Sequence, residues 1–269
     1  MSSINYKKLA NRIRAHAIKM TSRAKSGHVA SSMSMADILA VLYEKILHID
    51  PARPDWADRD RFILSKGHAG AGVYAVLAEK GFFPKEWLDT YYLDGGHLSG
   101  HISHCVPGVE FSSGSLGHGL PVSCGIALAG KRDGKNYRVF TLLSDGECDE
   151  GSNWEAALFA PQHKLDNLTV IIDYNKIQAL GPVQDIINLE PLAKKWQDFG
   201  WAVCEIDGHN YDEIEKALLS VPFEPGKPSC IVANTIKGKG VSFMENKVAW
   251  HYDCANPDQL CQALKELEE

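Results

Sequence analysis

The segment YRVFTLLSDGECDEG, residues 137–151, joins an apolar run to a cluster of acidic side chains. The apolar residues 137–143 predict a buried strand. Ser152 follows, with Glu155 three residues later, and this capping-box pattern predicts the start of a helix. Four carboxylates lie between Asp145 and Glu150, and carboxylates this close repel one another unless a positive charge lies among them. The segment therefore predicts a strand, a loop that needs a cation, and a helix.

The same alternation of strand and helix continues toward the C-terminus. Strands are predicted at 167–174, 201–207 and 228–235, and helices at 189–198 and 211–219. This pattern favours an α/β fold, a parallel sheet flanked by helices on both faces. The N-terminal third has helical periodicity instead, at residues 4–20 and again at 35–47, where Ser34 and Asp37 form another capping-box pattern. We expect one domain over residues 1–269, with the helical N-terminal third packed on the sheet.

Composition narrows the class of protein. The chain has 269 residues, of which 45% are hydrophobic, and a net charge of -6, with no basic cluster to indicate nucleic-acid binding. The N-terminus has no apolar signal region, and no apolar run approaches the roughly 18 residues of a membrane helix. The seven cysteines form no CxxC pair, which indicates scattered free thiols. We therefore expect a cytoplasmic protein that binds neither nucleic acid nor membrane.

Polar residues follow two of the predicted strands. Asp145 ends one strand, and Asn175 ends the next, 30 residues later. Ligands bind beyond the carboxyl ends of parallel strands, so neighbouring strands would bring these oxygens together. Mg²⁺ takes few protein ligands and completes its shell with water and phosphate oxygens, and Gly146 would let a phosphate approach the backbone. The acidic cluster therefore predicts a divalent cation with a phosphorylated cofactor, although a solvated acidic loop stays open.

An EF-hand is the one alternative that this segment excludes. Position six of such a loop would be Glu150 instead of Gly, and position twelve would be Ala156 instead of Glu.

Histidines follow glycines with unusual frequency. Six of the eleven do so: His28, His68, His97, His101, His118 and His209. Glycine suits loops where the backbone nears a ligand, and imidazoles in a cleft can move protons or bind sugar hydroxyls. The recurrence favours a site that uses some of them. Lys237 and Lys239 lie in a Gly-rich loop after a strand, where phosphate contact and a plain solvated loop are both open.

Six stretches together resemble the N-terminal part of transketolase, in the order of that family and over most of the chain. They are SGH (26–28), RFILSKGHA (61–69), SGHISHCVPGVEFSSGSLGHG (99–119), SDGECDEG (144–151), DYNKIQALG (173–181) and TIKGKG (235–240). The interval from Asp145 to Asn175 resembles the thiamine-diphosphate motif of the family. The resemblance implies thiamine diphosphate as cofactor, with Mg²⁺, Ca²⁺ or Mn²⁺.

The resemblance also implies roles for single residues. Asp145 and Asn175 resemble the metal ligands, with the backbone carbonyl of Ile177 as a third. His28 and His101 resemble catalytic residues that hold the sugar's oxygens, and His68 and His251 resemble catalytic histidines beside the cofactor. The implied cofactor-binding residues are His68, Gly114, Ser115, Leu116, Gly146, Glu150, Asn175 and His251. Glu150 resembles a glutamate that links two cofactor sites across the subunit interface.

Two departures from the family change what is expected. Ser144 replaces the first Gly of the motif, so the local turn is open to change. Full transketolases are more than twice as long, and the pyrimidine-binding and C-terminal domains are absent here. The resemblance therefore implies the N-terminal subunit of a split transketolase, active only with a C-terminal subunit, as an α2β2 heterotetramer. Such an enzyme transfers a two-carbon ketol unit from a ketose phosphate to an aldose phosphate, as in the pentose phosphate pathway.

Four other functions are weighed against this one. A transketolase-type subunit for an unusual branched sugar phosphate shares every motif quoted. The alpha subunit of a 2-oxo acid dehydrogenase shares the Asp–Asn motif but not the early SGH and SKGHA histidines. A Mg²⁺-dependent phosphohydrolase of the dehalogenase type needs a second Asp where Glu147 stands. A non-catalytic binding subunit is disfavoured by the intact Asp145, Asn175 and four site histidines.

Overall fold

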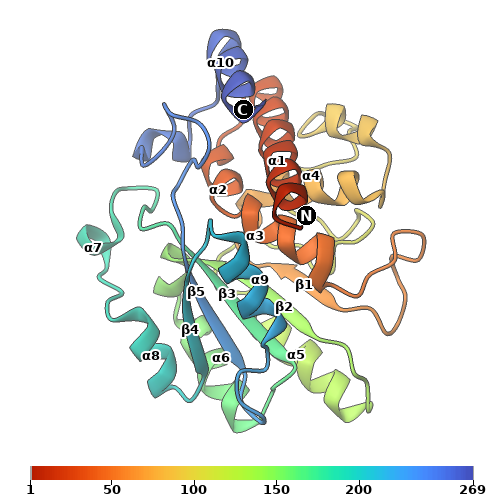
Figure 1. Ribbon diagram of the computed structural model, residues 1–269, viewed down its shortest axis with the longest axis vertical. Coiled ribbons are helices and arrows are strands. Elements are labelled where there is room, and N and C mark those ends of the chain that lie inside the picture. Colours follow the sequence, from red (N-terminus) through yellow and green to blue (C-terminus); the bar gives the residue numbers. More distant parts are fainter. Residues whose placement is uncertain (1, 269) are drawn as a thin grey trace.

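A five-stranded parallel sheet forms the centre of the computed structural model, which describes residues 2–268 (Figure 1). Its strand order is β1-β2-β3-β5-β4, and all neighbours run parallel. The strands are β1 Arg61–Leu64, β2 Val139–Ser144, β3 Leu168–Tyr174, β4 Ala202–Asp207 and β5 Ser229–Asn234. The predicted α/β fold is confirmed, while residues 1 and 269 of the expected domain lie outside the described residues.

The strands of the sheet centre are almost wholly apolar because both faces are covered. Alternate residues of one strand enter different cores. Phe140 and Leu142 of β2 belong to one core, and Val139 and Leu143 belong to the other. The sheet therefore separates two hydrophobic layers, each closed by helices.

Helices far apart in the sequence cover the two faces. The first core is covered by α1 Ser2–Ala24, α3 Ala36–Val41, α4 Gly70–Lys80 and α9 Tyr211–Leu219. The second is covered by α5 Gly119–Arg132, α6 Gly151–Gln162 and α8 Leu192–Asp198. A third core joins α1, α2 Val29–Ser34 and α10 Pro257–Glu268, so the two ends of the chain lie in the same part of the molecule (Figure 1).

Short elements complete the chain. They are the π-helical turn η1 Leu42–Ile46, the 3₁₀ turns η2 Gly67–Ala69, η3 Lys85–Thr90, η4 Gly146–Asp149 and η5 Val248–His251, and the helix α7 Val183–Ile186. No helix of residues 2–268 is both long enough and apolar enough to cross a bilayer. All seven cysteines are free thiols, as predicted.

The helices predicted after Ser34 and at Ser152 are present as α3 with η1 and as α6, but three local details are wrong. The N-terminal third contains strand β1, which pairs with β2. Ser34 is the last residue of α2, and its hydroxyl donates to Asp173 (2.5 Å) instead of capping α3. Ser152 lies inside α6 and donates to the carbonyl of Gly117 (2.7 Å). The local sequence pattern predicts that each serine hydroxyl caps a helix. Each hydroxyl instead donates to a group far along the chain, the Asp173 carboxylate for Ser34 and the Gly117 carbonyl for Ser152.

Candidate active site

A cavity of about 280 Å³ lies at the carboxyl ends of the strands. This is the edge of a parallel sheet where ligands bind. The residues that line it are His28, Ser31, His68, His101, Gly114, Leu116, Ser144, Asp145, Gly146, Asn175, Ile177, Gln178, Ala179, Lys237, His251 and Tyr252. The cavity thus gathers ten of the twelve residues predicted for the site. The other two, Ser115 and Glu150, are exposed and lie outside the described lining.

Asp145 and Asn175 meet because β2 and β3 are neighbours, with Ser144 paired to Asp173. The buried Asp145 carboxylate accepts hydrogen bonds from the backbone N–H groups of Gly146 (2.8 Å) and Lys176 (2.6 Å). Burial raises the pKa of Asp145 to about 6, and the nearby Asp173 adds to the rise. The sequence prediction that these two oxygens lie at adjacent strand ends is confirmed.

Lys237 is the positive charge beside this carboxylate. Its side chain is 1% exposed, and its ammonium donates to the carbonyl of Ile177 (2.9 Å) and lies 3.1 Å from Nδ1 of His251. Burial lowers the pKa of Lys237 to about 8, although Asp145 acts in the opposite direction. The alternative of a solvated loop is wrong for Lys237. Lys239 instead pairs with Glu245 at 3.6 Å on the partly exposed side of the loop.

The acidic cluster divides between two environments. Glu147 is fully buried and accepts from the Ser65 hydroxyl (2.5 Å) and the Gly117 N–H (2.9 Å), away from the cavity lining. Burial raises the pKa of Glu147. Glu150 is exposed. A uniformly solvated acidic loop is therefore wrong, since Asp145 and Glu147 serve different buried contacts.

Four histidines form a cluster at the cavity wall. The ring of His28 lies 5.1 Å from that of His68, 6.0 Å from that of His101 and 5.2 Å from that of His251, centroid to centroid. Burial lowers the pKa of His28 to about 4, with His101 and Lys237 adding to the effect. Burial and Lys237 lower the pKa of His251 to about 3, and burial and Lys66 lower the pKa of His68. These three imidazoles are neutral near pH 7, so each can donate through one nitrogen and accept through the other.

The other glycine-histidine pairs have different surroundings. His97 stacks on Trp87 at 4.1 Å, and His209 contacts Asp37. His118 precedes α5 and is exposed. Of the six histidines that follow a glycine, three therefore line the cavity (His28, His68 and His101), and three lie outside its described lining.

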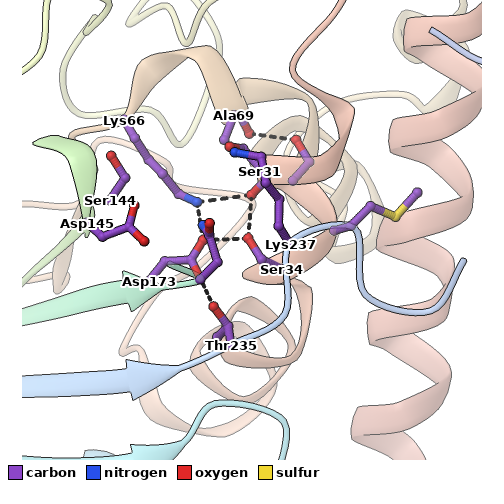
Figure 2. A network of polar contacts seen from close by, with 12 residues as sticks. Ser31, Ser34, Lys66, Ala69, Ser144, Asp145, Asp173, Thr235 and Lys237 are labelled. Carbon is purple, nitrogen blue, oxygen red and sulfur yellow. Dashed lines mark hydrogen bonds and ion pairs between the residues drawn. The ribbon is translucent and has the colours of Figure 1, made fainter. Parts of the chain in front are cut away.

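A buried polar network lies beside the cavity residues Ser31, Asp145 and Lys237 (Figure 2). Lys66 and Asp173 form an ion pair in which both side chains are fully buried. Asp173 also accepts from the hydroxyls of Ser34 and Thr235, and Lys66 donates to the carbonyl of Ser31 (3.0 Å). The sequence analysis missed Lys66, Asp173 and Ser31. Lys66 and Asp173 lie inside the quoted stretches 61–69 and 173–181, and Ser31 lies three residues after the first SGH, but no chemical pattern singles them out.

The donor set of the cavity fits a metal ion with an anionic cofactor. The Asp145 carboxylate, the Asn175 amide oxygen and the Ile177 carbonyl are the hard oxygen ligands that Mg²⁺ takes. Across residues 2–268 no group of three His, Cys, Asp or Glu side chains could hold a metal ion by themselves. A Cβ added at Gly114 would lie 3.4 Å from Cδ2 of His101, so Gly114 leaves room beside that ring.

Comparison with known proteins gives the family. The model described as "Transketolase, thiamine diphosphate binding domain" matches residues 5–267. The chain belongs to the transketolase family. It is 46% identical to a 6-deoxy-6-sulfo-D-fructose transketolase subunit of a Clostridium species, covering 97% of this chain and 95% of that one. It is 44% identical to an apulose-4-phosphate transketolase subunit of Actinobacillus succinogenes, covering 90% and 88%.

Full-length transketolases match over a shorter part of their own length. Human transketolase is 39% identical over 97% of this chain but only 42% of the human protein. The crystal structure of Campylobacter jejuni transketolase superposes with a TM-score of 0.93 at 32% identity, covering 98% of this chain and 43% of that one. The prediction of a split transketolase N-terminal subunit is confirmed, and membership of this family disfavours the phosphohydrolase and the 2-oxo acid dehydrogenase. Thiamine diphosphate binding belongs to the matched domain.

Proposed function

We propose that this chain is the diphosphate-binding subunit of a two-subunit transketolase and that the cavity described above holds the diphosphate end of the cofactor. One observation supports this most strongly. The two strand-end oxygen ligands, a buried lysine and four histidines line the same cavity. The oxygen ligands suit a metal, the lysine suits an anion, and the histidines suit a sugar. The chain forms a single domain in this proposal, and a partner supplies the pyrimidine-binding and C-terminal domains.

Each group of residues has a distinct task. Asp145, Asn175 and the carbonyl of Ile177 would hold Mg²⁺, Ca²⁺ or Mn²⁺, and Lys237 would contact phosphate as a point charge. Thiamine diphosphate, when bound, supplies the carbon nucleophile and stabilises the two-carbon unit. The backbone of Gly146 would approach the diphosphate, and Gly114–Leu116 the aminopyrimidine.

The histidines act on the sugar. Neutral His28, His68 and His251 can accept a proton from a sugar hydroxyl or donate one to a carbonyl oxygen. His101 is exposed beside Gly114, where it can hydrogen-bond a substrate oxygen. Such hydrogen bonds orient the ketose phosphate and the aldose phosphate for transfer of the two-carbon unit.

A second substrate class has its own support. The two relatives at 46% and 44% identity are named for 6-deoxy-6-sulfo-D-fructose and for apulose 4-phosphate. An unusual sugar of this kind is therefore the alternative to a straight-chain ketose phosphate. The proposal has four further parts. The protein is cytoplasmic and acts in the pentose phosphate pathway, it forms an α2β2 assembly, and Glu150 makes a contact across the subunit interface.

The first test measures cofactor binding and transfer with and without a C-terminal transketolase subunit. We expect Mg²⁺-dependent binding of thiamine diphosphate by calorimetry and ketol transfer only when both subunits are present. Asp145→Asn should weaken cofactor binding at least tenfold, about 1.4 kcal/mol. Asp133→Asn, at an exposed position after α5, is the matched control. Cofactor binding without any transfer in the assembled pair would favour the non-catalytic subunit.

A further inference from the structure

A polar chain outside the cavity ends on the loop that carries Lys237. Nε2 of His209 accepts a hydrogen bond from the backbone N–H of Ile236 (2.8 Å), one residue before Lys237. Its other nitrogen, Nδ1, lies 2.7 Å from the carboxylate of Asp37. A neutral imidazole has one proton. Because Nε2 accepts, that proton is on Nδ1 and is donated to Asp37.

Asp37 is the fixed end of this chain. It is 3% exposed and accepts two bonds from the guanidinium of Arg14 on α1 (3.1 and 2.5 Å) and one from the hydroxyl of Tyr211 on α9 (2.7 Å). Burial alone would raise the pKa of Asp37, but Arg14 and His209 outweigh it and hold that pKa below its usual value. The carboxylate is therefore ionised and joins three helices.

The Lys237 side chain depends on the position of its backbone. Its ammonium is buried, and in this structure it donates to the carbonyl of Ile177 (2.9 Å) at the cavity wall. A functional group held about 1 Å out of place loses such contacts. Other bonds that hold the loop are the N–H of Gly238 to the carbonyl of Ala30 (3.1 Å) and the N–H of Asn246 to the carbonyl of Lys237 (3.0 Å). His209 is the side chain that ties Ile236 to the ionised Asp37.

We propose that His209 is a positioning residue for cofactor binding. It connects the fixed Arg14–Asp37 pair to the backbone of Ile236, and so sets the point from which Lys237 reaches the diphosphate. The described lining of the cavity includes neither His209 nor Asp37, so His209 acts through Lys237. This inference rests on the proposed function, since it needs the anionic cofactor in this cavity.

The test compares three substitutions in the chain assembled with its C-terminal subunit. His209→Leu removes both hydrogen bonds, whereas His209→Gln can accept from Ile236 through its oxygen and donate to Asp37 through its nitrogen. Tyr211→Phe removes a bond to the same carboxylate without touching the loop. The readouts are the affinity for thiamine diphosphate with Mg²⁺, by calorimetry, and the midpoint of thermal unfolding. We expect about a tenfold loss of affinity for His209→Leu, near wild-type affinity for His209→Gln, and a lower midpoint with unchanged affinity for Tyr211→Phe.

A double-mutant cycle separates positioning from general damage. In a Lys237→Met background, His209→Leu should weaken affinity less than twofold further, because the lysine it positions is gone. Fully additive losses, or an equal loss of affinity in Tyr211→Phe, would overturn the inference. If His209→Leu does not fold, His209→Asn replaces it, since that side chain is too short to span Asp37 and Ile236.

The outcomes also separate the inference from the function on which it rests. If the wild-type assembly binds no thiamine diphosphate, or Lys237→Met binds it as tightly as wild type, the proposed site is wrong and the inference falls with it. If Lys237→Met weakens binding while His209→Leu leaves it unchanged, the site stands and the inference alone is wrong.

Discussion

Single residues in the cavity wall are held neutral by their surroundings. Burial and the positive charge of Lys237 both disfavour protonation of His28 and His251. A protonated cluster would place further positive charge beside Lys66 and Lys237, whereas a neutral one can exchange protons with a sugar. The lysines therefore contribute to the acid-base state of the histidines, apart from the phosphate contact proposed for Lys237.

The pKa of His28 makes stability depend on pH. The ordinary value is 6.5 and the folded value about 4, so between these values the unfolded chain binds more protons and the folded state loses stability as the pH falls. We expect His28→Gln to lose less unfolding free energy than wild type between pH 6.5 and 4. Because His28 is partly exposed, solvent screening keeps the difference below the roughly 1.4 kcal/mol per pH unit of one fully linked proton.

The measurement is urea denaturation at several pH values in that window. The raised pKa of Asp145 acts with the opposite sign, since stability from its proton is lost as the pH rises toward 6. Both proteins carry Asp145, so its effect cancels in the comparison. His163→Gln, at an exposed position after α6, is the control. Equal pH slopes for wild type and His28→Gln would contradict the prediction.

Lys66 and Asp173 form the second residue-scale prediction. Both side chains are 0% exposed, and removing one partner of such a pair leaves an uncompensated buried charge. We expect Lys66→Met to lower the unfolding free energy by about 3–5 kcal/mol. Lys66→Met combined with Asp173→Asn should recover part of this loss, because the neutral amide can accept from one of the Ser34 and Thr235 hydroxyls through its oxygen and donate to the other through its nitrogen. A single-mutant loss below about 1 kcal/mol in chemical denaturation would show that the pair is replaceable.

At the scale of elements, the turn η2 is fitted closely against the loop that carries Gly114. A Cβ on Gly67 would lie 2.0 Å from the backbone oxygen of Ser113, so Gly67→Ala must displace this loop. We expect a loss of more than about 2 kcal/mol together with weaker cofactor binding. Gly125→Ala is the matched control, because a Cβ there meets no atom within 4 Å and alanine favours a helix by about 1 kcal/mol. Thermal unfolding of both variants checks the prediction, and similar midpoints would refute it.

The elements also show what the sequence could and could not predict. Strands β2, β3 and β5 are recognisable because each is a mostly apolar run followed by turn residues, and β4, which also carries Glu205, because it fits the alternation of strands and helices. The pairing of β2 with β3 brings Asp145 and Asn175 together, so the placement of two of the three proposed metal ligands follows from pattern alone. Strand β1 has only four residues, which are too few to show the alternation of apolar and polar residues typical of a strand. It forms because it pairs with β2.

Long-range polar contacts account for the remaining differences between the sequence predictions and the structure. Ser34 looks like a helix cap in its local sequence, yet its hydroxyl bonds Asp173, which lies 139 residues away. The sequence leaves Lys237 between two alternatives because its neighbours Gly238 and Gly240 suit an exposed loop as well as a buried one. Only the packing of that loop against α2 and Ile177 decides between them. The roles of all the predicted site residues stay predictions, and Ser115 and Glu150 are in addition exposed and outside the described cavity lining.

At the scale of the whole molecule, the segment that continues from the cavity lining carries apolar side chains that nothing in the described part of this chain covers. Leu180 is 83% exposed, Ile187 54% and Ile186 38%. They belong to the segment that follows Ile177, Gln178 and Ala179 in the cavity lining. The chain corresponds to about two fifths of the full-length transketolases that it matches. Exposed apolar groups beside a site of this kind indicate a surface for another subunit.

We therefore expect the C-terminal subunit to cover this segment. Leu180→Ser should weaken the association of the two subunits about tenfold, because the serine forfeits burial of an exposed leucine side chain worth roughly 1.5–3 kcal/mol. The stability of the isolated chain should change by less than about 0.5 kcal/mol, as for other exposed positions.

Leu219→Ser is the control. Leu219 is 56% exposed and lies in a groove with Asp60 and Arg138, at the opposite edge of the sheet. Analytical ultracentrifugation of the mixed subunits gives the affinities. If Leu219→Ser weakened association and Leu180→Ser did not, the partner would have to bind at the other edge of the sheet, and the cavity could not be completed from the side proposed here.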